Sequence, residues 1–317
     1  MFWLEDTRAK LAAQLADDAL SHAVLIAGAQ GLGKRQLAGW LVGQYLRRDD
    51  SDEPTLVQLN ERHADFRHIG IPEDKKQISV EQIRDLSAAL TLSSHGGGGK
   101  AAVIEPANSM TIAAANSLLK TLEEPAGDTL LILVADDVSR LPATVVSRCS
   151  VYALRTPEER VSVQWLVDSG YALSDASVAL GFTSGAPLKA QALLANDALA
   201  GLQGIADEVV ALMDGREGAM AVSGRWRKLD FALVLDALRY VTQSVIYDAL
   251  APEVRSESGF SRYVIDTRDA FCYLDTVLRV ARRGAVAINT DMALDALALP
   301  WTQRLQGCFD GRATSDF

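Results

Sequence analysis

The chain has 317 residues, of which 49% are hydrophobic and 23% are charged, and its formal net charge is −10. This length allows two or three globular domains. The acidic balance argues against a protein whose whole surface binds DNA, because neutralising phosphates requires an excess of Lys and Arg. A small DNA contact, or membership of a DNA-bound assembly whose other subunits supply positive charge, stays open.

Signals for membranes, secretion and metals are weak in this sequence. Its apolar runs are shorter than the roughly 18 residues of a membrane helix, and the first ten residues, MFWLEDTRAK, show no signal-peptide core. Cys149, Cys272 and Cys308 are widely spaced and form no Cys-x-x-Cys pair, which is typical of a reducing compartment. We therefore expect a cytoplasmic protein with no membrane partner and no zinc or other metal, and we interpret His63 and His68 as solvated.

Strand and helix patterns alternate in the first half of the chain, from about residue 20 to residue 155. Apolar runs typical of buried strands lie at 23–27, 100–104, 129–135 and 150–154, and a further short strand is predicted at 56–59. Such alternation predicts a mostly parallel sheet with helices on both faces. The four glycines at 96–99 are interpreted as a flexible connector.

Two amphipathic helices are predicted between these strands. Residues 79–92 form the first, with Ser79 as its N-cap and Gln82 as the capping-box partner. Residues 112–124 form the second, which Pro125 ends. The side chains expected on its core face are Ile112, Ala115, Leu118, Leu119 and Leu122, and those expected outside are Asn116 and Lys120.

The second half of the chain is predicted to be helical. Residues 158–200 are rich in Ala, with a turn at 181–187, and long helical periodicity follows from about residue 201. Three apolar stripes are expected: Phe231, Val234, Leu235, Leu238, Val241 and Val245; Phe271, Leu274, Leu278 and Ala281; and Met292, Leu294 and Leu297. This pattern indicates a helical bundle in a separate domain.

A phosphate-binding loop is the most informative motif. Residues 28–35 read GAQGLGKR, which matches G-x-x-x-x-G-K except that Arg35 stands where Ser or Thr is required. The loop lies between a predicted buried strand and a predicted helix, so its backbone N–H groups and the helix N-terminus can face an anion. Gly28, Gly31, Gly33 and Lys34 are therefore the candidate nucleotide-binding residues of a degenerate loop, and whether a nucleotide occupies it stays open.

Two defects suggest that hydrolysis within this chain is lost or crippled. Arg35 puts a permanent positive charge where Mg²⁺ needs an oxygen ligand. The strand at 100–104 ends in Glu105-Pro106, where an ATPase of this type needs Asp-Glu. Glu105 could help to hold a metal, but Pro106 cannot activate water. Residual ATP or ADP binding stays open, and no cofactor is expected to be required.

Two further motifs carry a close resemblance to a known family. Residues 118–125 read LLKTLEEP, and Ser147-Arg148-Cys149 follows about twenty residues later. Together with the P-loop and the strand at 100–104, they resemble the sliding-clamp loader subunits of bacterial DNA polymerase III, which have AAA+ folds. The resemblance implies three domains: an α/β P-loop domain at 1–155 with a parallel sheet, a small helical lid at 156–200, and a C-terminal helical bundle at 201–317 that forms a collar.

Within this family the defects resemble the delta prime type, which does not hydrolyse ATP, more than the gamma/tau ATPases. Ala135-Asp136 stands where gamma subunits have a Thr pair, and Leu188 stands where they have an Arg. One departure from the family pattern is that the stretch 47–70 contains no cysteine, so the family's zinc module is not expected here.

The resemblance gives Arg148 a specific role. In clamp loaders, the Arg of Ser-Arg-Cys projects into the ATP site of the neighbouring subunit as an arginine finger, whereas an isolated surface Arg would more often form a salt bridge. Cys149 is expected to pack behind Arg148 without being reactive. The implied partners are the gamma/tau and delta subunits, with the sliding clamp and primed DNA reached through the complex. The chain would thus be part of a DNA-directed DNA polymerase holoenzyme, with no ATPase activity of its own expected.

Two other functions stay open at this stage. One is an active gamma/tau-like clamp-loader ATPase that uses Glu105 and an unusual Mg²⁺ shell. The other is a non-replicative adaptor that keeps the AAA+ fold only as a protein-binding scaffold. Direct DNA contact is also open, since Arg225, Arg227 and Lys228 form a small basic cluster, although a solvated face is the interpretation we favour.

Overall fold

The computed structural model describes the chain except for residues 47–54, 95–97, 251–259, 261, 284–287 and 309–317. The chain divides into two compact units, Met1–Pro157 and Glu158–Phe317, which are described here one at a time. The predicted glycine connector falls partly outside the described residues. The predicted boundary near residue 200, between a lid and a C-terminal domain, stays a prediction.

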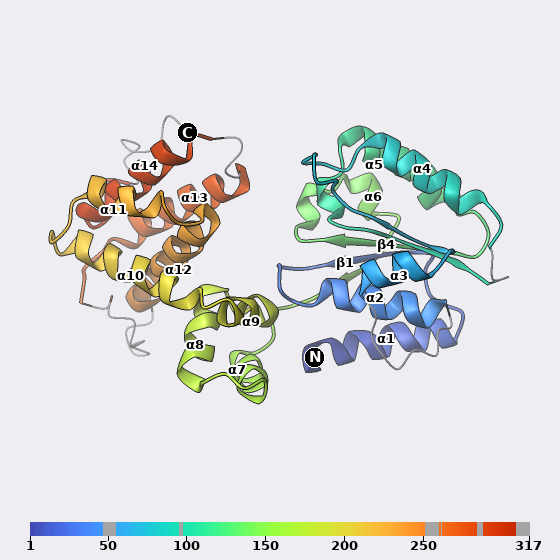
Figure 1. Ribbon diagram of the computed structural model, residues 1–317, viewed down its shortest axis with the longest axis horizontal. Helices are drawn as coiled ribbons and strands as arrows, with labels where there is room; N and C mark the ends of the chain where they lie inside the picture. Colours follow the sequence, from blue (N-terminus) through green and yellow to red (C-terminus); the bar gives the residue numbers. More distant parts are fainter. Residues whose placement is uncertain (47–54, 95–97, 251–259, 261, 284–287, 309–317) are drawn as a thin grey trace. The chain divides into compact units, whose positions relative to one another are not determined.

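A parallel sheet of five strands forms the centre of the first unit (Figure 1). The strands are β1 (Ala23–Ala27), β2 (Phe66–Ile69), β3 (Lys100–Ile104), β4 (Thr129–Ala135) and β5 (Ser150–Ala153), and their order in the sheet is β2-β3-β4-β1-β5. Every residue of β1, β3 and β4 is buried, as expected for central strands covered on both faces. The predicted α/β fold with a parallel sheet is confirmed.

Helices cover both faces of this sheet. The helical elements of the unit are η1 (Phe2–Leu4), α1 (Glu5–Ala16), α2 (Lys34–Tyr45), α3 (Leu56–Arg62), α4 (Val80–Thr91), η2 (Ala107–Ser109), α5 (Ile112–Glu123), η3 (Val138–Arg140) and α6 (Ala143–Val146). Helices α4 and α5 lie on one face, and α1, α2 and α3 lie on the other (Figure 1). Since the strands are parallel, the segments that follow β1, β3 and β4 meet at one edge of the sheet.

The structure of the first unit differs from the sequence-based expectations at three places. Residues 56–59 belong to helix α3, because the Thr55 hydroxyl accepts a hydrogen bond from the Gln58 backbone and the Gln58 side chain accepts one from the Thr55 backbone. Strand β2 was not predicted, since it is a short edge strand with a half-exposed surface. Ile112 is 79% exposed and does not face the core, because it occupies the first position of α5. The Ser79 and Gln82 capping box is confirmed.

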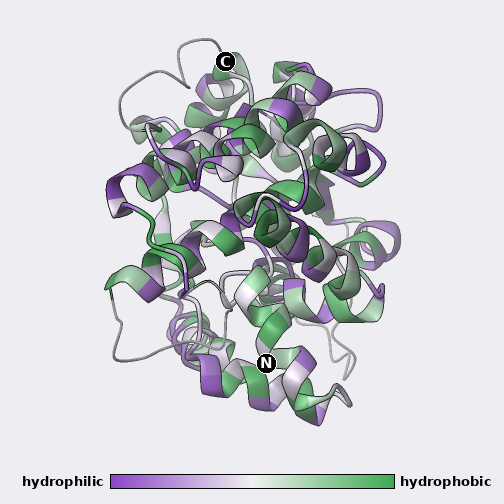
Figure 2. Cartoon of the chain, turned by 90° about the vertical axis from the view of Figure 1, so that its left-hand side faces the viewer, coloured by the Kyte–Doolittle hydropathy of each residue, from purple (hydrophilic) through white to green (hydrophobic). Residues whose placement is uncertain are grey.

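The described part of the second unit is helical, as predicted. Its helices are α7 (Glu159–Asp168), α8 (Leu173–Phe182), α9 (Pro187–Ala195), α10 (Leu199–Met213), α11 (Ala219–Trp226), α12 (Phe231–Leu250), α13 (Thr267–Arg283) and α14 (Thr290–Thr302). One apolar cluster joins α7, α8 and α9, and a larger one joins α10 to α14. The hydropathy colours change repeatedly along these ribbons, as expected for amphipathic helices (Figure 2).

The α12 stripe is confirmed, and the α13 stripe is wrong by one position. Phe271 is half exposed and Ala281 is exposed, whereas the buried side of α13 consists of Ala270, Tyr273, Val277 and Val280. The error arose because Tyr273 was not counted as a core residue. Its hydroxyl donates to the Leu297 carbonyl at 2.7 Å and accepts from the Trp301 indole at 2.8 Å, so burial leaves no polar atom unpaired. Met292 is also exposed, because it lies in the first turn of α14.

Truncations on α13 test the corrected register. Val277→Ala removes fully buried methyl groups, so we expect the free energy of unfolding to fall by about 2 kcal/mol. Leu278→Ala removes more atoms from a half-buried position and should cost less, about 1 kcal/mol or below. Urea denaturation followed by circular dichroism measures both values, and a larger loss for Leu278→Ala would contradict the observed register.

Candidate functional site

The P-loop has the geometry that its glycines predict. Gly28, Gly31 and Gly33 have φ angles of 147°, 81° and 91°, a backbone region that residues with a side chain rarely adopt. A Cβ on Gly28 would lie 2.7 Å from the Leu154 carbonyl oxygen. Helix α2 begins at Lys34, directly after the loop. The predicted order of strand, loop and helix is therefore confirmed, and the glycines shape the turn.

Lys34 is bound within the chain. Its side chain is only 7% exposed, and its ammonium group donates to the carbonyl oxygens of Gly28 at 2.8 Å and Ala29 at 2.7 Å. The third partner is the Asp136 carboxylate, whose Oδ1 lies 2.8 Å away. An ammonium group has three N–H donors, so these three acceptors match its whole capacity. A phosphate could bind Lys34 only by displacing one of them.

Asp136 is held in this position from two sides. Its carboxylate accepts a hydrogen bond of 2.9 Å from the Gln30 side chain in the P-loop. Its backbone N–H donates to the Asn108 side chain at 3.0 Å. Asp136 directly follows β4, the strand that pairs with β1. In the sequence, Asp136 stands out only as a departure from gamma subunits, and its ion pair with Lys34 was not predicted.

Arg35 is also paired with a carboxylate of the same sheet edge. Its Nε donates to Glu105 Oε2 at 2.8 Å, and His68 Nε2 lies 3.6 Å from the same oxygen. The His68 side chain is 14% exposed, so the prediction that it is solvated is wrong: β2 places it beside β3, which ends next to Glu105. Because Arg35 neutralises Glu105, the one carboxylate predicted to help bind Mg²⁺ faces a cation of the chain itself. These residues do not fit a Mg²⁺–nucleotide site.

The N-terminal segment packs against the P-loop, which no motif had indicated. The Trp3 indole donates to the Leu32 carbonyl at 2.8 Å. Leu4 and Leu32 are both buried. A Cβ on Gly33 would lie 2.9 Å from Leu4 and 3.1 Å from the sulfur of Met1. Apolar contact with η1 therefore holds the loop in addition to its polar contacts.

Arg148 lies on the surface between α6 and β5. Its Nε donates to Glu123 Oε1 at 2.7 Å, and its Nη2 lies 2.5 Å from the same oxygen. Its Nη1 donates to the Thr144 carbonyl at 2.9 Å. The Arg148 side chain is 35% exposed. The structure therefore places Arg148 in the salt bridge that was the alternative to a finger, at a position that a neighbouring molecule can reach.

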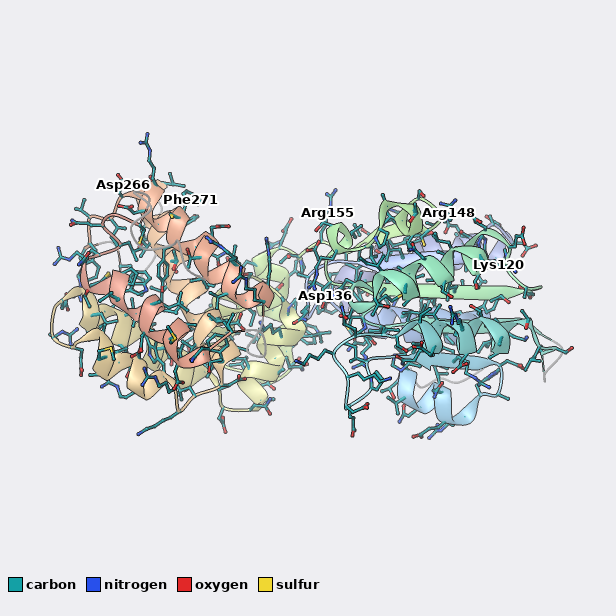
Figure 3. The ribbon with its side chains drawn as sticks, turned by 90° about the horizontal axis from the view of Figure 1, so that it is seen from above. Lys120, Asp136, Arg148, Arg155, Asp266 and Phe271 are labelled. Carbon is teal, nitrogen blue, oxygen red and sulfur yellow. The ribbon has the colours of Figure 1, made fainter. Side chains whose placement is uncertain are left out.

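Arg148 lies apart from the P-loop of its own chain. Figure 3 labels Asp136, which binds the P-loop lysine, and Arg148 at separate places of the first unit. Of the predicted site residues, the structure brings Gly28, Gly31, Gly33 and Lys34 together, and it leaves Arg148 outside that group.

Cys149 packs as expected beside the predicted finger. Its side chain contacts the core cluster under α5, and its thiol donates to the Val145 carbonyl. Burial raises the pKa of the Cys149 thiol to about 11, so this residue is a neutral thiol at physiological pH.

The arginines of the predicted basic cluster form ion pairs within the second unit, and Leu188 lies on a helix of that unit. Arg225 pairs with Glu208 at 2.5 Å, and Arg227 pairs with Asp295 at 2.6 Å, so the basic cluster is largely neutralised. Leu188 is a half-buried residue of α9. Within the described ranges, no three His, Cys, Asp or Glu side chains are grouped to hold a metal, and no helix is long and apolar enough to span a bilayer.

Comparisons with known proteins point to one family. The family model described as "DNA polymerase III, delta subunit" matches residues 3–158. DNA polymerase III subunit delta prime of Pseudomonas aeruginosa is 32% identical over 228 residues, which are 68% of this chain and 69% of that protein. The delta prime subunit of Haemophilus influenzae is 35% identical over 187 residues, which are 56% of this chain and 57% of that protein.

A solved structure resembles the chain over most of its length. The crystal structure of a gamma subunit-related protein from Thermotoga maritima covers 93% of this chain and 99% of its own, with 16% identity and a TM-score of 0.49.

Removal of the Asp136 carboxylate tests how Lys34 is held. In Asp136→Ala, a buried ammonium group keeps two carbonyl acceptors and loses its counter-ion, so we expect the free energy of unfolding to fall by about 1–3 kcal/mol. Gln30→Ala is the matched control: it removes one hydrogen bond to Asp136 but keeps the ion pair, and should cost about 0.5 kcal/mol or less. Equal stability of Asp136→Ala and the unchanged protein, in urea denaturation at pH 7, would show that the pair is unimportant.

The raised pKa of Cys149 predicts slow alkylation. A shift from 9.0 to about 11 leaves roughly one hundredth of the thiolate at pH 8, so iodoacetamide should modify Cys149 roughly 100-fold more slowly in the folded chain than in denaturant. Mass spectrometry of the Cys149 peptide over time measures both rates. A folded-state rate close to the denatured rate would contradict the buried position.

Proposed function

Because this chain belongs to the family of DNA polymerase III delta prime subunits, we propose that it is the subunit of a sliding-clamp loader that does not hydrolyse ATP. In this role it assembles with gamma/tau and delta subunits and helps to place the sliding clamp on primed DNA. It contributes surfaces and one arginine to the complex, while the chemistry of ATP hydrolysis takes place on its neighbours.

The ion pairs around the P-loop are the observation that carries this proposal. Hydrolysis needs Lys34 to contact phosphate and a carboxylate to hold Mg²⁺. Here Lys34 contacts Asp136, and Glu105 contacts Arg35. Each charge that should meet a nucleotide or its metal is matched by an opposite charge of the chain itself. A bound Mg²⁺–nucleotide would have to break both pairs and accept the positive Arg35 beside the metal.

The exposed position of Arg148 supports a role in trans. A guanidinium beside the transferred phosphate stabilises its developing charge, and such arginine fingers accelerate hydrolysis by about 10³–10⁵. Arg148 is partly exposed and lies apart from the P-loop of its own chain. We propose that it reaches the nucleotide site of an adjacent gamma/tau-type subunit.

The two alternative functions are less consistent with the geometry. A gamma-like ATPase would require Glu105 to bind a metal, whereas Glu105 is bound to Arg35. A non-replicative adaptor would have no reason to bind gamma/tau subunits, so a pull-down with purified gamma/tau separates it from the proposed function.

The isolated chain tests the absence of hydrolysis. We expect purified protein with Mg²⁺ and ATP to release phosphate no faster than a buffer control, because Lys34 is paired with Asp136 and Glu105 with Arg35. A coupled phosphate-release assay measures this rate, with a gamma-type ATPase as the positive control. Turnover of the same order as the positive control would overturn the proposal in favour of an active ATPase.

Arg148→Ala tests the arginine finger. In a reconstituted loader containing gamma/tau and delta, we expect the ATPase rate that depends on the clamp and primed DNA to fall by at least about 10-fold, since an arginine finger contributes about 10³–10⁵ at the site that it serves. Arg140→Ala removes another exposed arginine of the same unit and should leave the rate unchanged. Size-exclusion chromatography confirms assembly of both complexes. Equal rates for the two variants would rule out the finger.

A further inference from the structure

The position of Arg148 depends on the packing of α6 against α5. The C-terminal half of α5 and the helix α6 share one apolar cluster, in which Leu118 and Leu122 of α5 lie with Val145 of α6. Helix α5 ends at Glu123, and Arg148 follows α6 by two residues. Burial of these apolar side chains therefore fixes the backbone positions from which Glu123 and Arg148 meet.

The contact between the two side chains is specific in its geometry. Glu123 Oε1 accepts from Arg148 Nε at 2.7 Å and lies 2.5 Å from Nη2, so one carboxylate oxygen binds one edge of the guanidinium plane. Thr144, through its carbonyl, and Ser147, through its hydroxyl, accept from Nη1 at 2.9 Å and 3.4 Å. A guanidinium has five N–H donors, and these contacts leave at least one, on Nη2, for another acceptor.

This arrangement orients the side chain without trapping it. Glu123 and Arg148 are 50% and 35% exposed, and ion pairs at such positions contribute little to stability because water screens them. A nucleotide phosphate carries more negative charge than one carboxylate, so it can draw Nη2 outward while the Nε contact is kept. An arginine that is already ordered loses less conformational freedom when it binds a phosphate.

We propose that Glu123 is the positioning residue for Arg148: it holds Nε and one N–H of Nη2, so that the remaining Nη2 N–H is presented to the nucleotide of a neighbouring subunit. This inference rests on the proposed function, since it assigns a partner to the proposed finger. Glu123 itself does not touch the nucleotide. It acts through the orientation of Arg148, as the aspartate of a Ser-His-Asp triad orients the catalytic histidine.

The chain offers a matched control one residue away. Glu124 carries the same charge, is exposed, and also lies at the end of α5, where its backbone N–H bonds to the Lys120 carbonyl. Among the described contacts, none joins its side chain to Arg148. Glu124→Ala therefore changes the net charge of this surface as Glu123→Ala does, and leaves the contact with Arg148 in place.

The test compares variants in a reconstituted loader with gamma/tau, delta, clamp and primed DNA. For Glu123→Ala we expect kcat for ATP to fall about tenfold, with KM unchanged, because misplacing a group that acts in the transition state lowers kcat alone. Glu123→Gln should keep most of the activity, since its amide oxygen still accepts from Nε. Glu124→Ala should behave as the unchanged protein. In an Arg148→Ala background, Glu123→Ala should cause no further loss.

The outcomes separate this inference from the proposed function. If Arg148→Ala leaves the rate unchanged, the arginine finger is wrong and this inference fails with it. If Arg148→Ala is defective but Glu123→Ala turns over normally or faster, only the role of Glu123 is overturned. Equal defects in Glu123→Ala and Glu124→Ala would indicate a general charge effect and would also overturn it. Should Glu123→Ala not assemble, Glu123→Asp, which withdraws the oxygen by one methylene, is measured with the same expected direction.

Discussion

The ammonium group of Lys34 determines what the P-loop of this chain can do. It is buried, and the loop carbonyls and Asp136 match its three donors. A buried cation needs such partners, because removing it from water without compensation is costly. The same pairs that stabilise the loop therefore compete with any phosphate. Arg35 and Glu105 form a second ion pair, where an ATPase would bind Mg²⁺. The two ion pairs connect the segment after β1 with the ends of β4 and β3.

The P-loop and Arg148, the two features shared with clamp-loader ATPases, lie at different places in the first unit. The P-loop edge of the sheet is closed by internal ion pairs, and Arg148 lies at another place on the surface, supported by α5 and α6. The ion pairs of the P-loop therefore do not involve Arg148. The proposed function is consistent with that separation: under it, Arg148 would serve a neighbouring subunit, while Lys34 and Glu105 are paired within the chain.

Much of the first unit was predictable from the sequence, since fully apolar runs and caps determine β1, β3, β4, α4 and α5 locally. The errors arose where a local cap was missed or where tertiary contacts decide which side chains are buried. Residues 56–59 look like a strand but are capped as a helix by Thr55. The register of α13 was wrong because buried Tyr273 finds polar partners in α14. For the candidate site, the sequence predicted only which residues depart from a working ATPase, namely Arg35 and Glu105-Pro106. The pairing of Lys34 with Asp136 joins residues about a hundred positions apart, which a single sequence does not reveal.

A nucleotide titration of the purified chain, with and without Mg²⁺, tests whether the internal ion pairs keep nucleotide out of the P-loop. Isothermal calorimetry with ATP and with ADP measures binding to the protein as it is. Because Lys34 and Glu105 are both paired internally, the account predicts no saturable binding up to about 1 mM nucleotide, a limit of about −4 kcal/mol in binding free energy. It also predicts no difference when Mg²⁺ is added. Micromolar binding that requires Mg²⁺ would contradict the account, because it would show that both ion pairs open to form a working site.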